Sequence, residues 1–333
     1  MTDLRRRTAR VIASPRGIGA AVALLVGVAG AGCSPYRLPP PSPRLATLPA
    51  TLSAAGLYRD SQLRQLASDL RPYRPSFELW SDGATKRRWI RLPPGAAIDS
   101  SDLDDWRFPV GTELWKEFSV NGTRVETRLL AHVAPGDDGW AAVAYVWNAA
   151  QTDAVAAPDG MLGAAGTTHD VPPARACMTC HGGRASRVLG FSAIQLAHPP
   201  HTDDTRELTL DALVVERRLT TTPPPLVVPG DPIAVAALGY LHVNCGSCHN
   251  AARPASARFF RPRSDLDLWL TTATLATTAA TPAYRTVVDP PQVLDRFEHA
   301  GVLRRRMPPL ATNVVDPAGD LILSRWVRRL RGG

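Results

Sequence analysis

The stretch ELWKEFSV-NG-TRVETRLL, Glu113–Leu130, decides how the first half of this chain folds. Residues typical of strands lie on both sides of Asn121 and Gly122, a pair that favours the two-residue type I′ turn of a β-hairpin. We therefore expect one strand over Glu113–Val120 and a second strand over Thr123–Leu130.

The alternation within this hairpin predicts which side chains share a face. A two-residue turn places Phe118 opposite Val125. It also places Leu114 opposite Leu129, so that these apolar side chains face the core. The other face is expected to carry Trp115, Glu117, Glu126 and Arg128.

Further strands are predicted on either side of the hairpin. Trp89–Leu92 (WIRL) and Trp140–Trp147 (WAAVAYVW) are rich in aromatic and branched residues, which favour strands. Residues 61–165 are therefore predicted to form an antiparallel β-domain.

Four of the 5 cysteines occur in two copies of one motif, Cys177–His181 (CMTCH) and Cys245–His249 (CGSCH). C-x-x-C-H is the spacing of covalent c-type haem attachment, because two thiols separated by two residues reach the two vinyl groups of one haem. The histidine that follows then lies beneath the iron as its proximal ligand. The sequence thus predicts two haem c groups, attached through Cys177, Cys180, Cys245 and Cys248, with His181 and His249 on the irons.

Other uses of paired cysteines fit the sequence less well. Paired C-x-x-C units that hold zinc are normally about 15 to 20 residues apart, whereas Cys180 and Cys245 are 65 apart. Two disulfides would not require a histidine after each pair. A thioredoxin-like redox motif needs a βαβ context, which neither site has.

Two capped helices are predicted around the second motif. Asp231 and Asp316 each offer an N-cap that is followed by proline at the first helical position, and apolar residues then recur at helical spacing. Between them, 58 residues after His249, Met307 is followed by two prolines. The prolines restrict the backbone near the methionine sulfur, which suits a fixed ligand on iron.

This order of elements resembles the class I cytochrome c fold, which has an N-terminal helix, a C-x-x-C-H motif, a methionine loop and a C-terminal helix. The resemblance covers residues 228 to 331 and implies an all-α domain with His249 and Met307 as axial iron ligands. Mixed histidine and methionine ligation raises the reduction potential of a haem, which suits an electron carrier.

The layout of the whole chain, from Leu79–Gly83 (LWSDG) through both motifs to Met307, resembles a family of bacterial di-haem c-type cytochrome lipoproteins. That family has no established activity, so the resemblance implies an architecture more than a function.

The sixth ligand of the first haem is left open by the sequence. His169, shortly before the motif, is one candidate, but a histidine hydrogen-bonded within its own turn explains it equally well. If no side chain binds, the iron is five-coordinate and accessible to a small ligand such as peroxide or NO. Three other candidates are near in sequence: Met161, His198 and His201. His198 and His201 flank two prolines, which are typical of a surface loop. Three more are farther away: His132, His242 and His299.

The first 32 residues have the pattern of an export signal, with an arginine-rich start followed by the short apolar stretch Ile18–Ala31. Gly30–Cys33 (GAGC) resembles a bacterial lipobox, which implies that Cys33 is lipidated and that the chain is membrane-anchored. Gly30 departs from that pattern, because a larger apolar residue is usual there; an ordinary secretory signal is the alternative. Ser34 after the cysteine favours the outer membrane by the lipoprotein sorting rule.

Charge argues against a nucleic-acid partner. The formal net charge is +8, and residues 1–32 contribute half of it. No basic run in the chain is interleaved with aromatic residues, a pattern that would favour nucleic-acid binding.

The sequence therefore predicts an α+β multidomain chain in which an antiparallel β-domain precedes a haem-bearing segment and an all-α domain. The predicted parts are a signal peptide over 1–32, a proline-rich tether over 33–60, the β-domain over 61–165, the first haem-attachment segment and a linker over 166–227, and the cytochrome c-like domain over 228–333.

We expect a membrane-anchored di-haem cytochrome that transfers electrons to periplasmic or membrane redox proteins in the cell envelope. An alternative is a redox enzyme in which the methionine-ligated haem feeds electrons to an open first haem. A third possibility is a binding module whose β-domain recognises a partner or a glycan.

Overall fold

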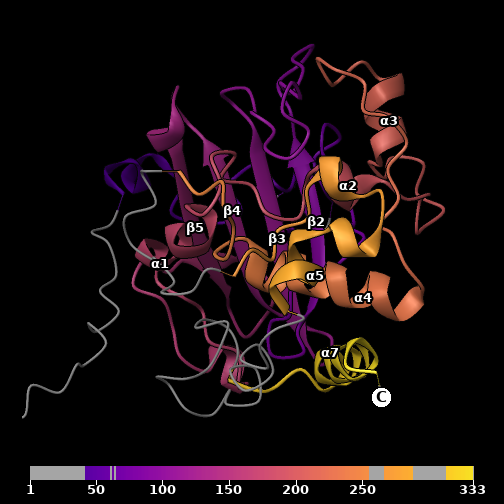
Figure 1. The fold of residues 1–333 in the computed structure, drawn as a ribbon. Helices are drawn as coiled ribbons and strands as arrows, with labels where there is room; N and C mark the ends of the chain where they lie inside the picture. The colour runs from indigo at the N-terminus through magenta and orange to yellow at the C-terminus, as the bar shows by residue number, and fades with distance from the viewer. Residues whose placement is uncertain (1–41, 61, 64, 255–265, 288–312, 333) are drawn as a thin grey trace, which may run out of the picture. The chain divides into compact units, whose positions relative to one another are not determined.

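The computed structural model contains a six-stranded sheet in which every strand pairs antiparallel with its neighbour in the chain (Figure 1). The structure describes residues 42–332 apart from 61, 64, 255–265 and 288–312. Cys33, Met307 and His299 lie outside these described residues. The strands are β1 (Arg71–Pro72), β2 (Thr85–Arg91), β3 (Glu113–Val120), β4 (Thr123–His132), β5 (Trp140–Trp147) and β6 (Ala154–Ala156).

The hairpin at the centre of this sheet is formed by β3 and β4, as predicted. Asn121 and Gly122 have φ values of 50° and 81°, and positive φ at both central residues is what a type I′ turn requires. Glycine adopts this conformation at little cost because it has no Cβ. The strand predicted over Trp140–Trp147 is also confirmed, as β5.

The register of the hairpin is not the expected one. Next to the turn, Ser119 lies opposite Arg124, as a two-residue loop requires. A β-bulge between Phe118 and Ser119 then shifts the pairing by one residue, so Phe118 lies opposite Glu126 and not opposite Val125.

The bulge also overturns the predicted faces of the hairpin. Leu114 pairs with Leu130 in place of Leu129. Because side chains alternate along a strand, Glu126 and Arg128 lie on the same face as Phe118, and not on the opposite face. Glu126 and Arg128, which simple alternation places on the face opposite Phe118, therefore lie on the same face as Phe118.

One face of the sheet is covered by the segment that precedes it. Leu52 and Leu57 have no exposed surface and belong to a core cluster with Trp115 and Tyr145 of the sheet. The backbone N–H of Leu52 donates to Ala154 O at 2.9 Å. The second half of the segment predicted as a tether thus contributes leucines to this core, because they find an apolar sheet face on which to pack.

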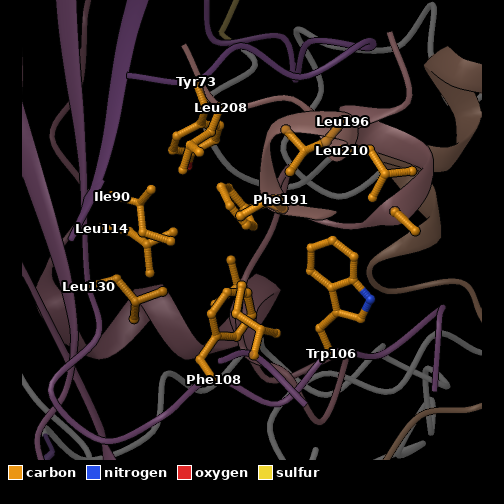
Figure 2. Packing of buried hydrophobic residues seen from close by; sticks show 14 of the residues in the cluster. Tyr73, Ile90, Trp106, Phe108, Leu114, Leu130, Phe191, Leu196, Leu208 and Leu210 are labelled. Carbon is orange, nitrogen blue, oxygen red and sulfur yellow. The ribbon is translucent and has the colours of Figure 1, made fainter. Parts of the chain in front are cut away.

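The other face packs against the segments that follow the first cysteine motif. Figure 2 shows Phe191 between Ile90 and Leu114 of the sheet on one side and Trp106 on the other. The rings of Phe191 and Trp106 meet edge to face with centroids 6.0 Å apart, a favourable geometry for aromatic pairs. Both faces of the sheet are thus buried.

The helices lie after the sheet in the chain. In Figure 1, α1, α2, α4 and α5 are drawn in front of the sheet. Their bounds are α1 (Ala174–His181), α2 (Ala193–Leu196), α3 (Leu210–Val215), α4 (Pro232–Leu241), α5 (Pro282–Val287) and α7 (Pro317–Leu330). Short 3-10 turns occur at η1 (Pro43–Thr47), η2 (Asp137–Gly139), η3 (Ala164–Gly166), η5 (Thr272–Thr274) and η6 (Thr278–Ala280).

Both predicted N-caps are confirmed. The Asp231 carboxylate accepts from two backbone N–H groups at the start of α4, and the Asp316 carboxylate does the same for α7. The two helices contact each other where Gly319 meets Tyr240; a Cβ on Gly319 would lie 2.4 Å from the Tyr240 ring. Gly239 on α4 makes room for the Phe77 ring.

The segment expected as a linker between the two motifs is hydrogen-bonded to the β-domain. It contains the short helix α3, and the chain that follows this helix pairs with the β-domain. Thr220 N donates to Ile98 O at 3.0 Å, and Thr221 N donates to Ser100 Oγ at 2.9 Å. Residues 37–333 form one compact unit. The chain is therefore α+β, with an antiparallel sheet in its N-terminal half and a few helices after it.

Candidate functional site

The first cysteine motif lies on α1, which begins after Pro173. Cys177 and Cys180 are three residues apart in this helix, so their thiols lie on the same side of it. His181 is the last residue of the helix. The local sequence thus presents two thiols and one imidazole together.

The His181 ring has a defined orientation. Its Nδ1 atom donates to the backbone carbonyl of Arg187 at 2.6 Å, and because a carbonyl only accepts, the proton is on Nδ1. Burial lowers the pKa of His181 to about 4, so the ring is neutral near pH 7. Its Nε2 atom therefore has a free lone pair, as in histidines that bind metals.

The second motif follows directly from α4. Cys245 lies in the π-helical turn η4 (His242–Gly246), and Cys248 and His249 come immediately after it. The backbone N–H groups of Cys248 and His249 both donate to Cys245 O, at 3.0 and 2.9 Å. Burial lowers the pKa of His249 to about 4. π-Helical turns are rare in proteins, and many of those that occur lie at functional sites.

The two motifs are neighbours in space although they are far apart in the sequence. A Cβ placed on Gly183 would lie 1.7 Å from Ser247 O. Cys248 Sγ approaches Thr179 O at 3.9 Å, and the thiols of Cys180 and Cys248 interact with each other. The chain thus brings four thiols and two neutral imidazoles into one region.

The four cysteines are neither oxidised nor arranged as a metal cluster. All four are free thiols, and among the described residues the only set of three potential ligands close enough to share an ion does not include them. Burial raises the pKa of Cys177 to about 11 and that of Cys245 to about 12. These thiols are therefore protonated near pH 7 when nothing is bound to them.

A row of cations crosses the sheet on the face that carries Phe118 and Glu126. Arg88 of β2, Lys116 of β3 and Arg128 of β4 are direct cross-strand partners. Like charges opposite each other destabilise a sheet. The row is near the first motif, because the charges of Lys116 and Arg128 both contribute to lowering the pKa of His181.

Only part of this positive charge is balanced by carboxylates. Arg88 approaches Glu78 at 3.5 Å, and Arg128 makes two hydrogen bonds to Glu126, at 2.5 and 2.9 Å. Within the described residues, Lys116 has no ion-pair partner. Burial and the neighbouring cations lower the pKa of Lys116 well below its ordinary value. The face therefore holds a partly uncompensated cation.

His169 is held by Glu126, in the same network. Its Nε2 atom lies 2.8 Å from Glu126 Oε2, and both side chains are almost completely buried. The backbone of His169 is bonded within its own turn, to Thr167 Oγ1 and Ala164 N, but the partner of its imidazole is 43 residues away in the chain. If His169 binds iron, it must do so through Nδ1, because Nε2 contacts Glu126.

Two other candidate histidines are also engaged. His242 accepts a hydrogen bond on Nδ1 from Leu270 N at 3.1 Å and packs on Trp269. The His132 Nδ1 atom lies 3.0 Å from the Phe108 carbonyl, and its ring stacks on Trp140. Met161, with 45% of its surface exposed, pairs with Val171 at the surface.

The cation row and its carboxylate are not predicted by the sequence pattern. Alternation alone put Glu126 and Arg128 on the face opposite Phe118, and only the bulge at Phe118 brings them to the first motif. The strand residues carry no evident local signal for a bulge of this kind. The face on which Glu126 and Arg128 lie could therefore not be predicted from the alternation of the sequence.

Comparison of the chain with protein-family models, with curated proteins and with solved structures finds no match. Among the described residues, no helix has both the length and the apolar character that crossing a membrane requires.

Proposed function

We propose that this chain is a membrane-anchored di-haem c-type cytochrome that transfers electrons. The observation that carries the proposal is the pair of C-x-x-C-H motifs, each of which ends in a histidine with a pKa of about 4. A neutral imidazole is the form that binds iron. Bound haem c would supply one-electron chemistry at its iron.

The residues around the first motif fit a haem. Cys177 and Cys180 would hold it, and His181 would bind the iron through Nε2, since Nδ1 is fixed by Arg187 O. Haem carries two propionate carboxylates, and the uncompensated Lys116 beside Arg128 offers them counter-charge. An anion at this face would relieve the repulsion within the row.

The residues around the second motif fit a haem as well. Cys245 and Cys248 would hold it, with His249 and Met307 as the axial ligands. Trp269 Nε1 and Arg184 Nε are buried donors that find no acceptor among the residues that the structure describes. Both belong to this region, because Trp269 packs on His242 and Arg184 lies 4.7 Å above the Trp269 ring. Buried donors of this kind call for an acceptor that is not yet in place.

We further propose that residues 228–331 adopt a class I cytochrome c-like arrangement. The packing of α4 against α7 through Tyr240 and Gly319 supports it, since that fold crosses its first and last helices. The contact between Gly183 and Ser247 supports electron transfer between the two haems, because it places both attachment motifs together.

A second candidate function is favoured by the state of His169. Its Nε2 atom is committed to Glu126 at 2.8 Å, so it would reach the iron only through Nδ1, and the sixth position stays open unless Nδ1 binds. An open position on the first iron would let a small molecule bind and be reduced. The first haem would then be catalytic, and the second haem would supply it with electrons.

The deciding experiment is haem content after expression with the cytochrome maturation system. We expect two haems per chain by the pyridine haemochrome assay. The pair of changes Cys177→Ala and Cys180→Ala, and separately Cys245→Ala and Cys248→Ala, should each leave one. A chain without covalent haem overturns the proposal. A ferric EPR spectrum then decides between the functions, since a high-spin centre that binds cyanide favours the enzyme and two low-spin centres favour the carrier.

Met307 can be tested by potentiometry. Met307→Leu should lower the reduction potential of one haem, because methionine ligation raises it. Met161→Leu is the matched control, since Met161 is a surface residue. Equal potentials in the Met307 variant and the wild type would remove Met307 from the site.

Membrane anchoring rests on Cys33 and has its own test. Cys33→Ala should move the protein from the membrane fraction to the soluble periplasmic fraction while haem content stays unchanged. A variant that remains in the membrane fraction contradicts the lipid anchor and leaves the haem proposal untouched.

A further inference from the structure

A cluster of two histidines and one glutamate lies on the loop between α2 and α3, in the motif His198-Pro-Pro-His201. One ligand atom from each of His198, His201 and Glu207 lies within 4.8 Å of the others. The two imidazole rings have centroids 4.1 Å apart. None of these residues is used in the proposed haem chemistry.

The two prolines explain why the imidazoles face each other. Each proline fixes its φ angle near −65°, so Pro199 and Pro200 leave the loop little freedom before any ligand binds. The His198 ring is held further, with Nε2 2.8 Å from Arg74 O and Nδ1 2.7 Å from Pro199 O. The spacing of the rings is therefore set by the chain.

Glu207 is oriented as a ligating carboxylate is. Its side chain is 3% exposed. Its Oε2 atom accepts from His201 N, Thr202 N and Thr202 Oγ1, at 3.1, 3.1 and 2.9 Å. Its Oε1 atom faces His201 Nδ1 at 3.1 Å. Hydrogen bonds on one oxygen that leave the other directed at the site are typical of metal-binding carboxylates.

We infer that His198, His201 and Glu207 form a binding site for a divalent transition metal, of which Zn²⁺ is the representative. Two imidazole nitrogens and one carboxylate oxygen are the ligands of borderline metals, whereas Ca²⁺ and Mg²⁺ require mostly oxygen. His201 is exposed, so water completes a four-coordinate sphere.

The separation of one pair of ligand atoms agrees with this assignment. Ligands at about 2.0 to 2.2 Å from zinc in a tetrahedron are about 3.4 Å from each other, close to the 3.1 Å between His201 Nδ1 and Glu207 Oε1. Both nitrogens of His198 contact carbonyl oxygens. A metal bound to one nitrogen would take the place of that contact, and the other contact would continue to orient the ring.

A metal at this site would join three segments of the chain. His198 follows α2, Glu207 precedes α3, and the His198 ring contacts the backbone of Arg74 before β2. The site would therefore clamp the loop 198–207 to the sheet, and it does not depend on haem.

The test is equilibrium dialysis of the full, haem-matured chain against zinc after chelator treatment, with zinc and iron measured by mass spectrometry. We expect one zinc per chain that is lost or weakened at least about tenfold in His198→Ala and in His201→Gln, since loss of even a supporting residue costs about 10- to 100-fold. Asp203→Asn, an exposed change in the same loop, is the matched control and should bind as the wild type does.

Two outcomes overturn the site. One is wild-type protein that binds no zinc; the other is a His198→Ala, His201→Ala double variant that binds zinc with wild-type affinity, which would assign the metal to other groups. Iron content and the melting temperature without zinc should be unchanged in every variant, so that loss of zinc is separated from misfolding and from failure of the haem proposal.

Discussion

Gly183 lies directly against Ser247, and a Cβ on Gly183 would stand 1.7 Å from the Ser247 carbonyl oxygen. Asn250 reinforces the contact, since its Nδ2 atom approaches Gly183 O at 3.4 Å and Ser247 O at 3.2 Å. The loop after the first cysteine motif and the turn inside the second motif are therefore in backbone contact. No side chain larger than hydrogen fits at position 183.

Gly183→Ala should destabilise the chain because the new methyl group must push the two motifs apart. Overpacking of this kind costs about 1 to 3 kcal/mol in the free energy of unfolding, measured by urea denaturation. Gly166→Ala is the comparison, since nothing lies within 4 Å of its Cβ position. It should lose only about 1 kcal/mol, from its positive φ. Equal losses would show that the contact is not tight.

Glu126→Gln should destabilise the chain by removing the carboxylate that balances Arg128. Breaking a buried ion pair from one side costs about 3 to 5 kcal/mol, because the remaining charge is left uncompensated. Urea denaturation at pH 7 measures the loss. Asp159→Asn, an exposed change of the same kind, is the control. A loss below 1 kcal/mol would mean that Glu126 is not ionised in the folded chain.

Glu126 should also make the stability of the folded chain depend on pH in the acid range. Burial alone would raise the pKa of Glu126, but Arg128 and the hydrogen bond from His169 outweigh it and hold the pKa below the ordinary 4.5. A carboxyl with a lowered folded pKa stabilises the fold above the unfolded value and loses that stabilisation as the pH falls through the folded value. Stability of the wild type should therefore fall below pH 4.5, and Glu126→Gln should show a flatter profile there.

His242→Leu should destabilise the chain because Leu270 N loses its acceptor in the core. An unsatisfied buried N–H costs about 1 to 3 kcal/mol. His242→Gln keeps an acceptor and should lose less, as read by thermal or urea unfolding. A Leu variant as stable as the Gln variant would contradict a role for this hydrogen bond.

His242 should affect the stability of the fold over a different pH range from Glu126. Burial, with a smaller effect of Arg184, lowers its pKa to about 3 from 6.5. The unfolded chain takes up the proton first, so stability from this group falls as the pH drops from 6.5 towards 3, by up to about 1.4 kcal/mol per unit. His242→Gln should lack this contribution, and an unchanged slope would refute the assignment.

Lys116→Met should stabilise the haem-free chain at pH 7. Burial and the charges of Arg88 and Arg128 lower the pKa of Lys116, which means that the folded state disfavours its ammonium group. The gain should shrink above pH 10.5, where the lysine is neutral in both states. Lys86→Met, whose pKa is lowered only to about 8, should give a smaller gain. Destabilisation by Lys116→Met would imply an anionic partner within the chain.

Short-range signals in the sequence predicted the local elements. The type I′ turn at Asn121 and Gly122, the strand β5 and the caps of α4 and α7 each depend on residues within a few positions of one another. Hydrogen bonds of turns and caps, and the alternation of a strand, are encoded over such distances. The two C-x-x-C-H motifs belong to the same class, since their chemistry is contained in five consecutive residues.

The tertiary structure alone decided what surrounds those motifs. The bulge at Phe118 turned Glu126 and Arg128 towards the first motif, and the leucines around Leu52 joined the core although prolines precede them. It also placed Gly183 on Ser247, 64 residues away. Each of these depends on packing between distant segments: burial is favourable only when a complementary surface is present, and a one-residue shift changes the face of every later side chain.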